Sequence, residues 1–160
     1  LKASGNAPQF MFGGTSGSVI TGGAGDDWLQ GGGGVNILSA GAGNDLLVSG
    51  IGIDSMTGGD GSDCFIFNSL IDLAIGSKSD IISDFVTGID KLVFANIDAD
   101  TTMTGDQAFV FVGANKFTAP GQLRFDKGAI YGNVNGDNKA DFSLGLTNIS
   151  SLNAQSDLIL

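Results

Sequence analysis

The residues with the clearest chemical meaning in this chain are aspartates that recur at a fixed spacing. Asp27, Asp45 and Asp63 are eighteen residues apart, and Asn36 and Asp54 lie midway between them. All 17 acidic residues of the chain are aspartates, which favour turns over helices. Carboxylate, amide and backbone carbonyl oxygens are the ligands of Ca²⁺, which takes six to eight of them. The spacing therefore predicts rows of calcium sites.

A nine-residue repeat must position these aspartates. Six consecutive units fill residues 13–66. Position 2 of every unit is glycine, position 8 is always large and apolar, and position 6 carries the aspartates or their substitutes. This pattern predicts a glycine-rich turn followed by a short strand whose middle residue enters the core, as in a parallel β-roll. A flexible glycine-rich linker, the alternative interpretation, would not keep an apolar residue at one phase through six units.

Each unit is predicted to form half a coil, so that units eighteen residues apart stack on the same edge. One edge then carries Asp27, Asp45 and Asp63, and we expect it to bind calcium strongly. The other edge carries Ser18, Asn36 and Asp54, and we expect weaker binding there. Glycine tolerates the positive φ angles that turn carbonyl oxygens toward the ion. The glycines assigned to the sites are Gly22, Gly23, Gly25, Gly32, Gly34, Gly41, Gly43, Gly50, Gly52, Gly59 and Gly61.

The nine-residue count extends beyond the six units in both directions. Counted backward, residues 4–12 form a degenerate unit with Gln9 at position 6 and Met11 at position 8. Counted forward, Asp72 falls at position 6 of a unit that has lost its glycines. The count alone leaves open whether Asp72 joins Asp54 or stands there by coincidence.

Composition excludes several classes of function. A net charge of −10 disfavours nucleic acid and anionic membranes as partners. Without histidine, the chain cannot form a Ser-His-Asp triad or a metalloprotease zinc site. Cys64 is the only cysteine, and we expect a half-buried residue in a strand. No segment is apolar enough to insert into a bilayer. The start at Leu1, without an initiating Met, suggests a piece of a longer protein.

The second half of the chain predicts further strands. The strand-like runs are 81–85, 91–94, 108–112, 122–125, 129–134 and 140–146. Asn135 and Gly136 form a hairpin signal between the last two runs, and we expect an antiparallel layer packed on the end of the roll. The segment 133–141 places oxygen-bearing side chains at alternate positions, like the start of an EF-hand loop. It departs from that motif with asparagine at position 1, no glycine at position 6 and no terminal glutamate, so a plain turn is favoured.

The repeat units resemble the RTX (repeats-in-toxin) nonapeptide G-G-x-G-x-D-x-U-x, which residues 22–30 and 58–66 match in full. The segments 79–94, 121–126 and 132–144 and the ending SDLIL look like the C-terminal domain of serralysin metalloproteases. The resemblance implies an all-β fold, with a calcium-loaded parallel β-roll (4–75) followed by an antiparallel β-sandwich-like part (76–160). It also implies that Asp72, Asp80 and Asp90 take the last calcium.

The same resemblance implies a secreted protein whose C-terminal residues are a type I secretion signal. The partners would be calcium ions, the type I secretion apparatus and an N-terminal catalytic domain of a protease, lipase or polysaccharide-degrading enzyme. The chain itself carries no catalytic residues, so we expect a module that folds on extracellular Ca²⁺. One alternative is a polysaccharide-binding or adhesive module that uses Trp28 and Phe10 to stack on sugars. Another is a glycosidase with a pair of aspartates, but calcium binding explains those residues better.

Overall fold

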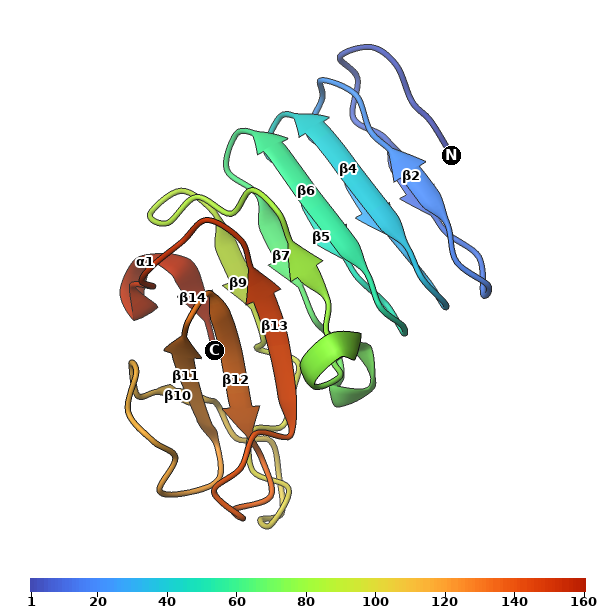
Figure 1. The fold of residues 1–160 in the computed structure, drawn as a ribbon. Helices are drawn as coiled ribbons and strands as arrows, with labels where there is room; N and C mark the ends of the chain where they lie inside the picture. The colour runs from blue at the N-terminus through green and yellow to red at the C-terminus, as the bar shows by residue number, and fades with distance from the viewer.

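A computed structural model describes residues 1–160, apart from the side chain of Ser77. Two β-sheets lie face to face (Figure 1). The six-stranded sheet contains, in spatial order, β1 (Phe10–Phe12), β3 (Trp28–Gln30), β5 (Leu46–Val48), β7 (Cys64–Ile66), β9 (Lys91–Val93) and β14 (Leu158–Ile159). The eight-stranded sheet contains β10 (Val110–Phe111), β11 (Gln122–Asp126), β12 (Ala129–Asn133), β13 (Phe142–Leu146), β8 (Ile81–Ile82), β6 (Ser55–Asp60), β4 (Ile37–Ala42) and β2 (Val19–Thr21).

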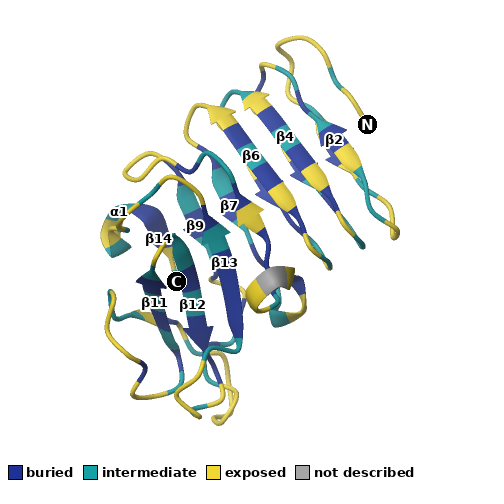
Figure 2. Ribbon diagram, viewed as in Figure 1, coloured by how far each residue is buried: buried dark blue, intermediate teal, exposed yellow. Residues whose placement is uncertain are grey.

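The repeats form a parallel roll with one strand per unit, alternating between the two sheets. Strands pair in parallel with a register shift of eighteen residues, as in Met11 with Leu29 and Leu29 with Leu47. The residue at position 8 of each repeat unit points inward and is fully buried from Ile20 to Phe65. Figure 2 shows these buried positions as a dark band across the strands. The half-coil prediction and its division of the units by parity are therefore confirmed.

The repeat glycines are required because the turns stack in direct backbone contact. Gly59 has a φ of 108°, and a Cβ atom added to it would lie 1.8 Å from the carbonyl oxygen of Gly41, eighteen residues earlier. Gly61 has a φ of 137° and would place a Cβ 1.7 Å from the carbonyl oxygen of Gly43. A side chain at either position would need both a disfavoured backbone conformation and a wider separation of the coils.

Both sheets continue beyond the last repeat. β8 pairs in parallel with β6, and β9 pairs in parallel with β7, so the roll gains one more strand on each side. β11, β12 and β13 are antiparallel to one another, but β13 joins the eight-stranded sheet through a parallel pairing with β8. The all-β class is confirmed. The second half of the chain does not form a separate antiparallel layer, because its strands extend the eight-stranded sheet and make it a mixed sheet. The division of the chain at residue 75 stays a prediction.

The helical elements of the described residues are short. They are η1 (Leu70–Asp72), η2 (Gly76–Lys78) and α1 (Ala154–Asp157). None of them is long or apolar enough to cross a membrane. η1 and η2 lie in the connection between β7 and β8, where they replace the glycine turn of a regular unit. α1 precedes β14, the edge strand of the six-stranded sheet, which pairs with β9.

Candidate metal centre

The aspartates of the first edge form a ladder between stacked turns. This edge consists of the turns 22–27, 40–45 and 58–63 and the segment before Asp90. The Oδ1 atom of each aspartate accepts a hydrogen bond from the backbone N–H at the same position one coil earlier. Gln9 donates to Asp27 (2.8 Å), Asp27 to Asp45 (2.7 Å), Asp45 to Asp63 (2.9 Å) and Asp63 to Asp90 (3.0 Å). Gln9 therefore stands where the backward count placed it.

The second edge repeats this arrangement on the opposite side of the roll. The backbone N–H of Asn36 donates to Asp54 Oδ1, and that of Asp54 donates to Asp80 Oδ1, both at 2.8 Å. The charge of Asp72 raises the pKa of both Asp54 and Asp80, after the larger effect of burial, which indicates that Asp72 lies on the same edge as this pair. The structure therefore places Asp72 and Asp80 with Asp54, but Asp90 on the first edge with Asp63. The three aspartates of the predicted last calcium site do not come together.

One side-chain oxygen of several ladder residues is buried without a hydrogen-bond partner in the described structure. These atoms are Oδ2 of Asp45, Asp54, Asp63 and Asp80, and Oδ1 of Asn36. Buried polar atoms are almost always satisfied, since leaving one unpaired costs about 1–3 kcal/mol. A row of unpaired carboxylate oxygens on stacked turns indicates that a cation completes them.

A backbone carbonyl also borders the space beside the Asp27 carboxylate. A Cβ added at Gly22 would lie 2.3 Å from the carbonyl oxygen of Ala40 and 2.4 Å from Asp27 Oδ2. At Gly58 it would lie 2.1 Å from Asp63 Oδ2. Among the described residues, no three carboxylates, cysteines or histidines cluster closely enough to hold a metal by themselves. The donor set is therefore carboxylate plus carbonyl, which suits Ca²⁺ and not zinc.

Burial and mutual repulsion raise the pKa of the ladder carboxyls. Burial, followed by the charges of Asp90, Asp45 and Asp84, raises the pKa of Asp63 to about 6. Burial, followed by the charges of Asp54 and Asp72, raises the pKa of Asp80 to about 7. Both shifts disfavour the ionised form in the folded chain without metal. The metal-free roll is therefore destabilised at neutral pH by the same groups that would hold a cation.

The raised pKa values predict that protonation of these carboxyls stabilises the metal-free fold, and so partly substitutes for calcium binding. An unfolded aspartate has a pKa near 3.8, so the metal-free fold binds more protons than the unfolded chain between about pH 4 and pH 7. The free-energy cost of keeping these buried carboxyls ionised in the metal-free fold is largest at pH 8. This cost diminishes as the pH falls through 7 and 6. The two shifts amount to a gain of about 4 kcal/mol in folding free energy between pH 8 and pH 5. Circular dichroism in excess chelator should show more strand structure at pH 5 than at pH 8.

The matched variant removes the two carboxyls with the largest pKa shifts, Asp63 and Asp80. With Asp63→Asn and Asp80→Asn together, the difference between pH 8 and pH 5 in chelator should largely disappear. Strand content in chelator that stays constant or falls toward pH 5 would contradict the electrostatic account of the two sites.

Sequence reasoning missed Asp84, because this residue lies outside the nine-residue phase. Its Oδ1 accepts the N–H of Gly58 (3.0 Å) and its Oδ2 accepts the N–H of Gly59 (2.8 Å). Its charge contributes to the raised pKa of Asp63 and of Asp90. Only a resemblance could have indicated Asp84, since its partners lie 25 and 26 residues earlier.

The segment 133–141 forms a turn held by its own hydrogen bonds. Asp141 Oδ2 accepts the N–H of Val134 at 2.7 Å, and Asn135 Oδ1 accepts that of Asp137 at 2.9 Å. Asp137 Oδ1 accepts the N–H of Lys139 at 2.9 Å. These oxygens already have partners, so the geometry supports the plain-turn interpretation over an EF-hand-like site.

Comparisons with known proteins identify the repeats. Residues 12–47 and 41–73 match the family model of the RTX calcium-binding nonapeptide repeat (4 copies). This part of the chain consists of RTX repeats, which bind several Ca²⁺ ions. A comparison with curated protein sequences gave no match.

Two solved structures from the mannuronan C5-epimerase of Azotobacter vinelandii are similar to the chain. The AlgE6R2 subunit is 24% identical with a TM-score of 0.61, and the match covers 100% of this chain and 92% of that one. The AlgE6R3 subunit is 24% identical with a TM-score of 0.48, and the match covers 97% and 80%. The likeness to AlgE6R2 shows that the two chains share the β-roll fold.

The two edges should differ in calcium affinity. Asp27 faces another carboxylate, Asp45, on the next coil, whereas Asn36 contributes a neutral amide beside Asp54. Asp27→Ala should therefore raise the calcium concentration at half-folding more than Asn36→Ala does, by about tenfold, or 1.4 kcal/mol. Parallel calcium titrations of the two variants test the difference. Equal midpoints would show that the edges bind calcium equally well.

Proposed function

We propose that the chain is a calcium-dependent folding module of a larger secreted protein. The observation that carries this proposal is the set of buried, unpaired carboxylate oxygens on stacked turns of RTX repeats. Without calcium, repulsion between these groups and the conformational entropy of 27 glycines oppose folding. Extracellular calcium at millimolar concentration would bridge the coils, so that binding free energy becomes folding free energy.

The ligands in this proposal are the ladder side chains with the turn carbonyls. Asp27, Asp45, Asp63 and Asp90 would serve the first edge, and Asn36, Asp54, Asp72 and Asp80 the second. The carbonyls would come from the repeat glycines that the sequence pattern assigned. Asp84 would support the last turn of the first edge through its hydrogen bonds to Gly58 and Gly59.

The C-terminal residues would act as a type I secretion signal, as the resemblance to serralysins implies. In the folded chain Leu158 packs into the core, and Asp157 is fully buried. The Asp157 carboxylate accepts hydrogen bonds from Thr87 Oγ1 at 2.6 Å and from the Gly88 N–H at 2.7 Å. Recognition of this segment by the secretion apparatus would therefore have to precede folding. Low cytosolic calcium would keep the chain in that exportable state.

The parent protein would carry its catalytic domain on the N-terminal side of this chain and would be a secreted hydrolase. The chain itself would have no catalytic role. It would act after export, when calcium binding folds the module and withdraws the C-terminal segment into the six-stranded sheet. A division near residue 75 would separate the calcium-binding roll from a C-terminal part that carries the signal.

Binding of a polysaccharide is a second candidate function. Phe10, Trp28 and Leu46 are neighbours in register on the outer face of the six-stranded sheet, and each is at least 36% exposed. The rings of Phe10 and Trp28 lie 6.1 Å apart. Such a row suits stacking on sugar rings. The structurally similar AlgE6R2 subunit belongs to an enzyme of mannuronan, an acidic polysaccharide, which adds to the case.

Limited proteolysis over a range of calcium concentrations tests the main proposal. The chain should be cleaved throughout its length at about 10⁻⁷ M Ca²⁺ and become resistant at about 10⁻³ M, the range of extracellular calcium modules. Magnesium at the same concentration is the control and should not protect. Resistance in excess chelator would overturn the proposal. Export of a fused reporter, with and without residues 157–160, tests the secretion signal separately.

A further inference from the structure

The few basic residues of the chain gather in one place. Lys116, Arg124 and Lys139 are three of only seven lysines and arginines, and all three line a surface pocket of about 400 Å³. Phe117, Asn138 and Ala140 complete the lining. Every charged residue of this lining is cationic, although the whole chain carries a net charge of −10. We name these six residues the basic pocket.

Arg124 lies beside two aromatic rings at this pocket. It lies on the outer face of β11, opposite Tyr131 on β12. Its guanidinium carbon is 5.7 Å from the ring centre of Phe117 and 5.2 Å from that of Tyr131. Its side chain is 25% exposed, and its one acceptor in the described structure is Asp126 Oδ2, at 3.5 Å. A guanidinium stacked on rings keeps its N–H donors in its own plane, available to a bidentate partner.

The lysines of the pocket also remain available. Lys139 is 81% exposed on its side chain, and its contact with Asp137 at 3.7 Å is long and solvent-exposed. Lys116 and Asn138 are exposed as well. Exposed ion pairs of this kind contribute little, so an incoming anion can replace them at small cost.

We propose that the basic pocket binds the carboxylate of an acidic sugar within a polysaccharide. Arg124 would pair with the carboxylate, the two lysines would add charge, and Asn138 would bond a hydroxyl group. Phe117 and Ala140 add apolar surface to the same lining. A volume of about 400 Å³ exceeds the needs of an inorganic anion and lies within the range of small-ligand pockets. The proposal deepens the second candidate function and does not depend on calcium-dependent folding.

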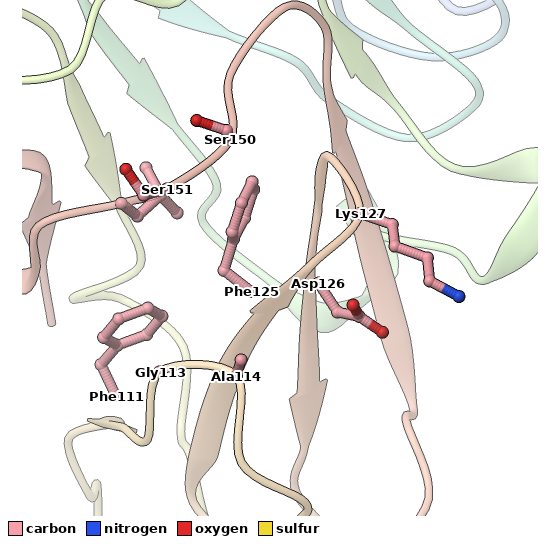
Figure 3. Close-up of a pocket in the computed structure, with 9 residues that line it drawn as sticks. Phe111, Gly113, Ala114, Phe125, Asp126, Lys127, Ser150 and Ser151 are labelled. Carbon is pink, nitrogen blue, oxygen red and sulfur yellow. The ribbon is translucent and has the colours of Figure 1, made fainter.

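A neighbouring pocket supplies the control. Figure 3 shows Phe111 and Phe125 facing Ser150 and Ser151 in a pocket of about 250 Å³, while the amine of Lys127 projects away from the two rings. Lys127 lies three residues after Arg124, just beyond the end of β11. It carries the same charge as the lysines of the basic pocket but lies outside its lining.

The test is calorimetric titration of the calcium-loaded chain with a tetrasaccharide of uronic acid, after the folded state has been verified by circular dichroism. We expect binding that Arg124→Gln weakens at least tenfold and Lys139→Gln several-fold, while Lys127→Gln changes the dissociation constant less than twofold. Arg124→Lys should lose most of the affinity as well, because a lysine cannot form the planar bidentate contact. A neutral tetrasaccharide should bind at least tenfold more weakly.

Several results would overturn the proposal. Equal binding of the neutral sugar would show that charge is irrelevant. An equal effect of Lys127→Gln and Lys139→Gln would indicate general electrostatic attraction in place of a pocket. Tighter binding of a tetraglutamate peptide would make this a peptide site. Complete absence of uronate binding would reject the pocket while leaving calcium-dependent folding intact.

Discussion

Gly59→Ala is expected to prevent formation of the roll even at saturating calcium. The new Cβ would lie 1.8 Å from the carbonyl oxygen of Gly41, and the φ of 108° is disfavoured for any residue with a side chain. Gly59 pairs with Gly41 within the eight-stranded sheet, so the backbone cannot move away without breaking the stack. We expect a loss of roughly 4 kcal/mol or more. Circular dichroism and thermal unfolding in millimolar calcium measure the loss.

Gly14→Ala is the matched control, because Gly14 occupies the same position of the first unit. A Cβ at Gly14 would have no atom within 4 Å. Gly14 also does not have a positive φ angle, unlike Gly59. Its replacement should therefore change the free energy of unfolding by no more than about 0.5 kcal/mol. If both variants folded equally well, close stacking of the turns would not be what the repeat glycines provide.

Asp63→Asn is expected to have two effects of opposite sign. Asp63 Oδ2 is buried without a partner, so the loss of its charge should weaken calcium binding and raise the half-folding calcium concentration at least tenfold. In chelator at pH 8, the same variant should contain no less strand structure than the natural chain. This follows because burial and the charges of Asp90 and Asp45 disfavour the ionised carboxyl. Calcium titration and circular dichroism in chelator measure the two effects.

Asp26→Asn removes the same charge from an exposed side chain of the turn 22–27 on the same edge. Asp26 Oδ1 accepts the N–H of Asn44 at 2.7 Å, and an asparagine oxygen can accept it equally well. The calcium midpoint should move less than about twofold. A shift as large as that of Asp63→Asn would mean that total charge, and not a ladder of specific ligands, governs the response to calcium.

The repeat half of the fold could be predicted because its physics is local and periodic. Position 8 must be apolar to enter the core, and from the second unit onward positions 2 and 4 are glycines at which a side chain would obstruct stacking. Both requirements recur at a period that can be counted. Because alternate units stack on the same edge, the count alone predicts that Asp27 neighbours Asp45 and that Asn36 neighbours Asp54.

The part beyond residue 66 was less predictable, because pairing there depends on contacts between distant segments. The antiparallel pairing of β12 with β13 followed from a hairpin signal, but the parallel pairing of β13 with β8 spans more than sixty residues and has no local signature. The positions of Asp80, Asp84 and Asp90 depend on loops that break the nine-residue count. Their assignment to two different edges therefore required the structure.

The same limit applies to the basic pocket. In the sequence, Lys116, Arg124 and Lys139 are scattered among many aspartates, and the net charge of −10 gives no indication of an anion site. The register of β11 against β12 brings Arg124 beside Tyr131, and the loop before β11 adds Phe117 and Lys116. Charge distribution in space, not net charge, decides whether an anion can bind there.

Hydrogen–deuterium exchange of the ladder amides tests the central claim most directly. The N–H groups of Asp27, Asp45, Asp54 and Asp63 donate to carboxylates that we assign to calcium. With millimolar calcium, exchange at these amides should be slowed by at least a thousandfold, and in chelator at pH 8 they should exchange at the rate of an unfolded chain. Equal protection of these amides with and without calcium would contradict the claim that calcium binding folds the roll.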